Sequence, residues 1–181
     1  MRTAIVIPNL ISALRLGLAA WFPFAPEAAR AWLLIAAGVS DLADGYIARR
    51  YHLSSWVGGL LDATADKFFA FMALMTFTVG PELAWWHPIP LLLRDITVAL
   101  IACYAVVRRK WYAFRHMPAR ALGKCTTAAM FVLFLLLAAG TVPVWITDCV
   151  IWLVALLSGS AGVDYFLVFL HAKRADRARG M

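Results

Sequence analysis

The feature that most constrains this chain is a series of long apolar stretches, each followed by a short connection. The stretches lie at about 8–24, 29–50, 56–79, 88–107, 120–139 and 144–171. A helix needs about 20 mostly apolar residues to cross the hydrocarbon core of a bilayer. The pattern therefore predicts an all-α integral membrane protein with six transmembrane helices, in which residues 1–181 form a single domain.

The composition excludes several other classes of protein. The chain is 64% hydrophobic and 15% charged, whereas a soluble domain has about 45–50% apolar and about 25% charged residues. A soluble chain this apolar could not cover its surface with polar groups, which argues against a cytosolic globular protein and a disordered chain. The net charge of +7 fits loops that meet anionic lipid headgroups better than it fits a nucleic-acid partner.

The basic residues predict how the helices are oriented. Lysines and arginines gather after the second, fourth and sixth stretches, at 49–50, 108–115 and 173–179, and the opposite connections hold little besides Arg30. Because short cytoplasmic loops carry the positive excess, both termini are expected in the cytoplasm. Trp85 and Trp86 lie where an aromatic belt belongs on the far side. We expect a multi-pass protein of the cell inner membrane whose active site faces the cytoplasm.

Four aspartates lie inside the predicted second and third helices, at Asp41, Asp44, Asp62 and Asp66. A carboxylate inside a bilayer costs at least ~2.5–3.5 kcal/mol, so four of them need a reason. Spacings of three and four place each pair on one helix face. The short connection makes the two helices antiparallel neighbours, so that their acidic faces can meet near the cytoplasmic surface.

Four carboxylates that converge in a low-dielectric medium repel one another, so they are expected either to take up protons or to be neutralised by cations. Oxygen ligands without nearby Cys or His favour Mg²⁺ or Mn²⁺, and two such ions match four carboxylates in charge. The alternative is that the acids form structural ion pairs with Arg49, Arg50 and Lys67. Because Arg49 and Arg50 can reach the headgroups by snorkelling, we expect the acids to be left unpaired by arginine.

The segment from Asp41 to Asp66 resembles the signature of the CDP-alcohol phosphotransferase family, also called the CDP-alcohol phosphatidyltransferase family. The matching positions are Asp41, Asp44, Gly45, Ala48, Arg49, Gly58, Asp62 and Asp66. Segment 8–12, together with Arg15, is similar to the amphipathic entry segment of that family. The resemblance covers essentially the whole chain, because the family is also built as six transmembrane helices.

The resemblance implies an enzyme of phospholipid synthesis that transfers a phosphatidyl group from CDP-diacylglycerol to an alcohol and releases CMP. It implies that Asp41, Asp44 and Asp62 hold two divalent ions. Asp66 would also touch the metal site, and it would take the proton from the attacking hydroxyl.

The same resemblance implies where the CDP-lipid binds. Gly45, Ala48 and Gly58 would leave room for the cytidine nucleotide, and Arg49 would help to hold its phosphates. The two glycines remove side chains from the acidic faces, which favours a bulky ligand there.

Basic residues in the fourth and fifth helices indicate the acceptor. Arg94 lies inside an apolar run, and Lys124 opens the fifth helix after Arg120. Buried cations near an anionic metal site favour a pocket for an acceptor phosphate. Arg-Asp at 94–95 and Gly-Lys-x-x-Thr at 123–127 resemble the phosphatidylglycerophosphate synthase and cardiolipin synthase branches. The alternatives are an internal ion pair of Arg94 with Asp95 and interfacial anchoring by Lys124.

Glycerol 3-phosphate is therefore the expected acceptor, and phosphatidylglycerol and inositol phosphate are the alternatives. A cation transporter is the rival from another class, since intramembrane acids also build ion pathways. Against that rival, the four acids cluster at one membrane depth, whereas a relay would spread them across the bilayer. A homodimer would be natural for so small a membrane enzyme, although no interface is legible in the sequence.

Overall fold

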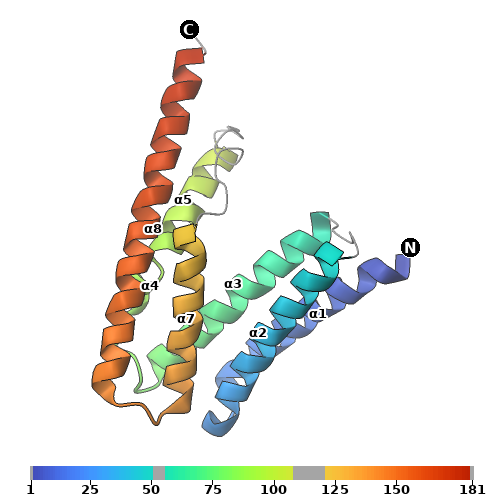
Figure 1. Ribbon diagram of the computed structural model, residues 1–181, viewed down its shortest axis with the longest axis vertical. Coiled ribbons are helices and arrows are strands. Elements are labelled where there is room, and N and C mark those ends of the chain that lie inside the picture. The colour runs from blue at the N-terminus through green and yellow to red at the C-terminus, as the bar shows by residue number, and fades with distance from the viewer. Residues whose placement is uncertain (1, 51–55, 108–120, 180–181) are drawn as a thin grey trace. The chain divides into compact units, whose positions relative to one another are not determined.

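The computed structural model describes the backbone of residues 2–50, 56–107 and 121–179, and side chains mainly within 12–41, 62–105 and 121–171. Every regular element in these ranges is helical (Figure 1). The elements are α1 (Arg2–Trp21), the 3₁₀ helix η1 (Phe22–Phe24), α2 (Glu27–Arg50), α3 (Trp56–Val79), α4 (Pro88–Leu91), α5 (Leu93–Val107), α7 (Ala121–Ala139) and α8 (Val144–Arg179). The predicted all-α fold is confirmed for this part of the chain.

Three helices differ from the predicted stretches. Helix α1 begins at Arg2, before the predicted start at about residue 8, and ends at Trp21. The fourth stretch is broken at Leu92, which separates α4 from α5. The sixth continues beyond the apolar run, because α8 extends through the basic tail to Arg179. The break at Leu92 places Arg94, a candidate site residue, in the first turn of α5.

Among the helices that the structure describes, α7 and the 144–171 part of α8 are long and apolar enough to cross a membrane. Helices α2 and α3 carry the aspartates, which lower their hydropathy, and α5 has 15 residues. The six-span topology therefore stays a prediction.

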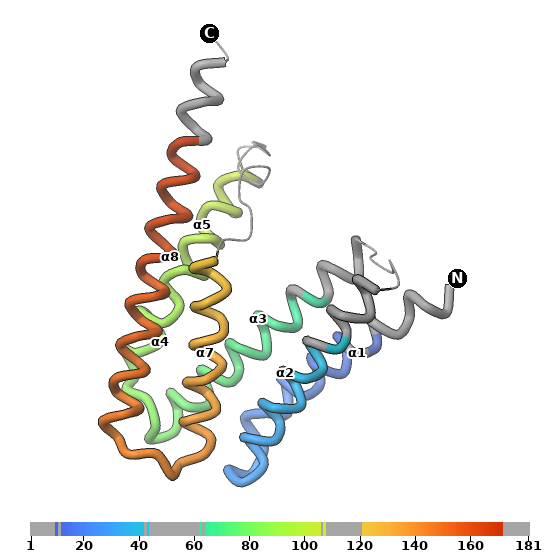
Figure 2. Tube along the Cα trace, viewed as in Figure 1, coloured from blue at the N-terminus to red at the C-terminus, as the bar shows by residue number. Residues whose placement is uncertain are grey.

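The helices pack as two compact units. The first comprises the chain up to Ala84 together with Phe134–Thr141, and the second comprises Trp85–Leu133 and the chain from Val142 onward. In the first unit, α1 packs against both α2 and α3. Helices α2 and α3 run in opposite directions, as predicted and as the tube along the chain shows (Figure 2). In the described residues, however, each of them packs mainly against α1 and not against the other.

Aromatic side chains build the core of the first unit. The ring of Phe22 lies edge-on to the rings of Phe69 and Phe77, with centroids 5.6 Å and 6.0 Å away. Phe134 stacks on Phe77 at 6.0 Å. Edge-on and offset aromatic pairs are favourable because the positive ring edge meets the negative ring face. These contacts anchor η1 to α3 and α3 to the segment that begins at Phe134.

In the second unit, α5 and α4 pack against α8. Tyr104 lies edge-on to Phe169, with ring centroids 5.4 Å apart, beside buried Ile101 and Ala105. The two helices approach closely at Gly162, where an added Cβ would lie 3.2 Å from Thr97 Oγ1.

Many large apolar side chains lie on the surface instead of in a core. Phe24, Val79 and Trp85 are 82%, 89% and 80% exposed. Extensive apolar surface is unfavourable in water but matches the hydrocarbon of a bilayer. The exposed apolar side chains therefore agree with the membrane protein that the composition indicates.

Candidate functional site

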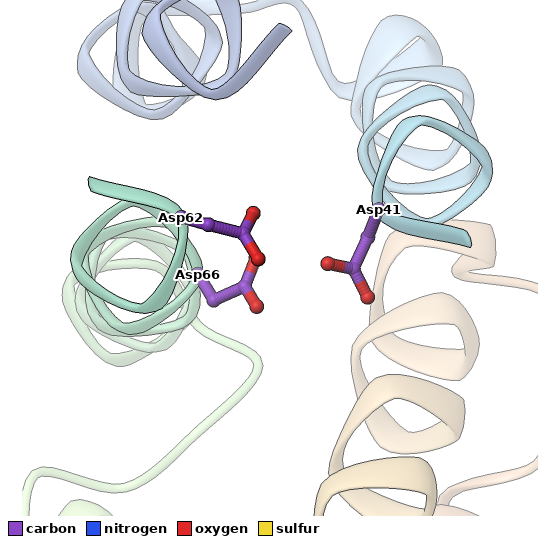
Figure 3. A group of neighbouring side chains, drawn as sticks. All are labelled: Asp41, Asp62 and Asp66. Atoms are coloured by element: carbon purple, nitrogen blue, oxygen red, sulfur yellow. The ribbon is translucent and has the colours of Figure 1, made fainter. Parts of the chain in front are cut away.

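Three of the four predicted acids meet in the first unit. Asp41 on α2 faces Asp62 and Asp66 on α3 (Figure 3), and one carboxylate oxygen from each lies within 4.8 Å of the others. Asp62 and Asp66 are one turn apart, so both side chains leave the same face of α3. The prediction that the acidic faces of the second and third helices meet is confirmed for these three carboxylates.

The remaining positions of the signature lie on α2 and α3, but their side-chain surroundings fall outside the described residues: Asp44, Gly45, Ala48, Arg49 and Gly58. Arg120 also lies outside the described residues. The roles expected of these six residues stay predictions.

The cluster contains a cation from the protein itself. Arg15 Nη1, on α1, lies 3.2 Å from Asp41 Oδ1 and 3.0 Å from Asp62 Oδ1, and it also donates to Asp66 Oδ1. The Arg15 side chain is 2% exposed. Ser12, one turn earlier on α1, donates to Asp62 Oδ1 at 3.5 Å. The expectation that arginine leaves these acids unpaired is wrong, because α1 packs against both acidic helices and carries Arg15 between them.

One arginine does not neutralise three carboxylates. When Asp41, Asp62 and Asp66 are ionised, their three negative charges exceed the single charge of Arg15 by two. Carboxylate oxygens alone are the donor set of Mg²⁺ or Mn²⁺, and two oxygens on opposite sides of Mg²⁺ lie about 4.2 Å apart. The three oxygens lie within 4.8 Å of one another, which is compatible with that separation. The residues present therefore fit a divalent cation in charge, donor type and spacing.

Arg94 is held by a separate set of contacts in the second unit. Its Nη1 donates to the carbonyl oxygen of Gly123 and, at 3.0 Å, to Thr127 Oγ1. Its Nη2 lies 2.9 Å from Asp95 Oδ1, so the internal ion pair named above as an alternative is present. Arg94 is 8% exposed. The guanidinium thus has a fixed position against the first turns of α7.

The break at Leu92 gives Arg94 this position. In a continuous helix the Arg94 N–H would bond the carbonyl four residues earlier. Here it donates to Ser158 Oγ at 3.0 Å, and the Ser158 hydroxyl donates to Leu91 O at 2.8 Å. Ser158 is fully buried on α8. This one hydroxyl satisfies a donor and an acceptor at the break, and α5 begins with Arg94 in its first turn.

The second predicted cation, Lys124, follows directly after Gly123, whose carbonyl oxygen accepts a hydrogen bond from Arg94. A Cβ at Gly123 would lie 3.0 Å from Tyr165 Oη and 3.8 Å from Arg94 Nη1, so the glycine makes room for both side chains. Lys124 is the next residue and is exposed, so the expectation of a buried cation holds for Arg94 and is wrong for Lys124, which lies at the start of α7. The structure therefore brings Arg94 to the turn of α7 that carries Lys124.

The comparison with known proteins identifies the family. Residues 5–159 match the model of the CDP-alcohol phosphatidyltransferase family. The chain belongs to this family. A putative cardiolipin synthase of Mycobacterium tuberculosis is 32% identical over 148 residues, which cover 78% of this chain and 68% of the relative. A CMP-forming cardiolipin synthase of Streptomyces coelicolor is 31% identical over 154 residues (80% and 70%). A probable phosphatidylglycerophosphate synthase of M. tuberculosis is 33% identical over 140 residues (75% and 63%).

Membership of the CDP-alcohol phosphatidyltransferase family confirms the enzyme prediction over the transporter alternative. Enzymes of this family are membrane proteins that use divalent metals and act on CDP-diacylglycerol and an alcohol. The aspartate cluster of this phosphatidyltransferase is a group that could hold such a metal.

A substitution at Gly162 tests the close packing that holds the Arg94 region of this phosphatidyltransferase. We expect Gly162→Leu to lower the unfolding temperature in detergent by several degrees, because overpacking costs about 1–3 kcal/mol. A Cβ there meets Thr97 Oγ1 at 3.2 Å and backbone atoms of residues 93 and 94 at 3.5 Å. Gly17→Leu is the matched control, since no atom lies within 4 Å of a Cβ at Gly17. Equal unfolding temperatures for the two variants would contradict the close approach of α5 and α8.

Proposed function

We propose that this phosphatidyltransferase moves the phosphatidyl group of CDP-diacylglycerol to a hydroxyl of glycerol 3-phosphate and releases CMP. The observation that carries the proposal is the convergence of Asp41, Asp62 and Asp66 from two helices within the family signature. Transfer at phosphorus depends mainly on positioning and on stabilisation of charge, so a compact group of carboxylates with few other side chains is sufficient.

In this proposal Asp41, Asp44, Asp62 and Asp66 hold two divalent ions, Mg²⁺ or Mn²⁺. When bound, the ions supply positive charge that stabilises the leaving phosphate. Asp66 takes the proton from the acceptor hydroxyl. The hydroxyl oxygen forms a bond to the phosphorus of the phosphatidyl group, and the bond from that phosphorus to the oxygen of CMP breaks. The position of Asp66 beside the other two carboxylates supports this role.

The CDP-lipid would lie against the adjoining turns of α2 and α3. Gly45, Ala48 and Gly58 leave room for the cytidine nucleotide, and Arg49 holds its phosphates. These assignments are supported by the match of the four positions to the family signature. The acyl chains would stay in the bilayer, where they meet the exposed apolar side chains of the helices.

The acceptor phosphate would bind to Arg94, Lys124 and Arg120. Arg94 is fixed by Gly123, Thr127 and Asp95, so little side-chain entropy is lost when it binds an anion. Lys124 is exposed in the first turn of α7, where the helix dipole also favours negative charge. Neutral or cationic acceptors such as serine, ethanolamine and choline would gain nothing from these groups.

Phosphatidylglycerol is the second candidate acceptor. It is favoured by relatives named as cardiolipin synthases in Mycobacterium and Streptomyces. Like glycerol 3-phosphate, it offers a glycerol hydroxyl and an anionic phosphate, so the same cations would hold it. Inositol phosphate shares the phosphate and is the third candidate.

We further propose that the enzyme crosses the cell inner membrane six times, with both termini and the aspartate cluster on the cytoplasmic side. The gathering of basic residues at 49–50, 108–115 and 173–179 supports this orientation. The two compact units would form one transferase domain, since the family match at 5–159 includes parts of both. The homodimer stays a prediction.

A CMP-release assay tests the proposed function. Purified full-length protein is incubated with CDP-diacylglycerol, Mg²⁺ or Mn²⁺, and one of five acceptors: glycerol 3-phosphate, phosphatidylglycerol, inositol phosphate, inositol or serine. We expect CMP release with glycerol 3-phosphate, loss of release on chelation of the metal, and recovery when Mn²⁺ is restored. Release with phosphatidylglycerol alone would select the second candidate. No release with any of the five acceptors would overturn the proposal.

A further inference from the structure

Arg15 lies at the centre of the carboxylate cluster. Its Nη1 is in hydrogen-bonding or ion-pair contact with Oδ1 of Asp41, Asp62 and Asp66. A single ion that bound these three oxygens would lie close to the position of Arg15 Nη1, because that position is near all three oxygens. A guanidinium N–H and a divalent ion cannot occupy it together, because they compete for the same oxygens and repel each other.

We infer that Arg15 is the resident counter-ion of the aspartate cluster and that a divalent ion displaces its guanidinium. The inference rests on the proposed metal-dependent function. Arginine stays protonated in proteins, so Arg15 cannot give way by losing a proton. Its side chain has to move out of the group of oxygens when an ion enters.

This arrangement has two opposite consequences. Without ions, Arg15 holds together three partly exposed carboxylates that otherwise repel one another, so it stabilises the ion-free protein. During ion binding, the contacts of Arg15 with the carboxylates must be broken, so Arg15 weakens the apparent affinity for the ion. A purely structural arginine that stayed in place would also repel the ion, but its guanidinium would not become more accessible to solvent when the ion bound.

The experiment compares Mn²⁺ binding to the full-length protein and to Arg15→Gln in detergent, with Mn²⁺ measured by electron paramagnetic resonance. We expect Mn²⁺ to bind Arg15→Gln about tenfold more tightly, which corresponds to about 1.4 kcal/mol. We also expect the unfolding temperature of Arg15→Gln to fall in chelator and to recover most of the loss in saturating Mn²⁺. Arg30→Gln is the matched control, because it removes a mostly buried arginine of the same unit that pairs with Glu82 at 3.5 Å. Its Mn²⁺ affinity should equal that of the unaltered protein.

Unchanged or weaker Mn²⁺ binding in Arg15→Gln would overturn the displacement and leave the proposed function standing. Failure of the unaltered protein to bind Mn²⁺ would overturn both. If Arg15→Gln does not fold, the unaltered protein provides the test through modification of arginine by phenylglyoxal, followed by mass spectrometry of the peptide that contains Arg15. Modification of Arg15 should become several-fold faster in Mn²⁺, and an equal or slower rate would overturn the inference.

Discussion

Replacement of Asp66 by asparagine is expected to lower the rate of CMP release about 10²–10⁴-fold, the range that general-base catalysis contributes. An amide cannot take the proton of the acceptor hydroxyl, but its carbonyl oxygen can still face a cation. Binding of Mn²⁺ should therefore weaken much less than turnover. The measurement is CMP release under saturating substrates, together with Mn²⁺ titration of the same sample.

Two further variants separate the roles within the cluster. Asp62→Asn removes a proposed ligand that has no role as a base, so turnover and Mn²⁺ affinity should fall together. Asp148→Asn changes an exposed aspartate of α8 and should alter neither quantity. Full activity of Asp66→Asn would reject the proton-accepting role. Equal losses of Mn²⁺ binding and of turnover would show that Asp66 acts only as a metal ligand.

The second large effect is expected at the acceptor site. Lys124→Gln should raise KM for glycerol 3-phosphate about 10- to 150-fold, because a hydrogen bond to a charged group contributes about 1.5–3 kcal/mol. The KM for CDP-diacylglycerol should change less than about twofold, because the lipid nucleotide contacts other residues in the proposal. Lys124 is exposed, so its substitution should not disturb folding. Steady-state kinetics with each substrate varied in turn provides the measurement.

Arg94→Lys tests the same site from α5. Lysine keeps the charge but lacks the planar fork that meets Gly123 O, Thr127 and Asp95. We again expect a selective rise in KM for glycerol 3-phosphate. Lys173→Gln, in the basic tail of α8, is the control and should leave both KM values unchanged. A similar rise in KM for both substrates in Lys124→Gln and Arg94→Lys would contradict a pocket specific for the acceptor phosphate.

The elements of the fold could largely be predicted from local information. Helix α3 has the predicted bounds, and α2 and α7 begin within two residues of theirs. The bounds of a helix depend on the length of its apolar run and on the Pro and Gly residues that interrupt it. Both are local features, so a single segment of sequence is enough to predict the bounds. The two-unit packing was not predictable, because it depends on contacts between segments far apart in the chain.

The members of the acidic cluster and the family of the enzyme could be predicted from the order of the amino acids. Spacings of three and four place the aspartates on helix faces, and a short connection makes the two helices run in opposite directions. Both are local consequences of helix geometry, and Asp41, Asp62 and Asp66 accordingly meet.

The groups that surround these residues became known from the packing of the helices. Arg15 meets Asp62 and Asp66 across 47 and 51 residues of chain, and Ser158 meets Arg94 across 64. No periodicity within one helix encodes such partners, because they depend on which helix packs where and on how each is rotated about its axis. A buried arginine or an interrupted helix must find compensating groups, but the sequence does not say which segment supplies them.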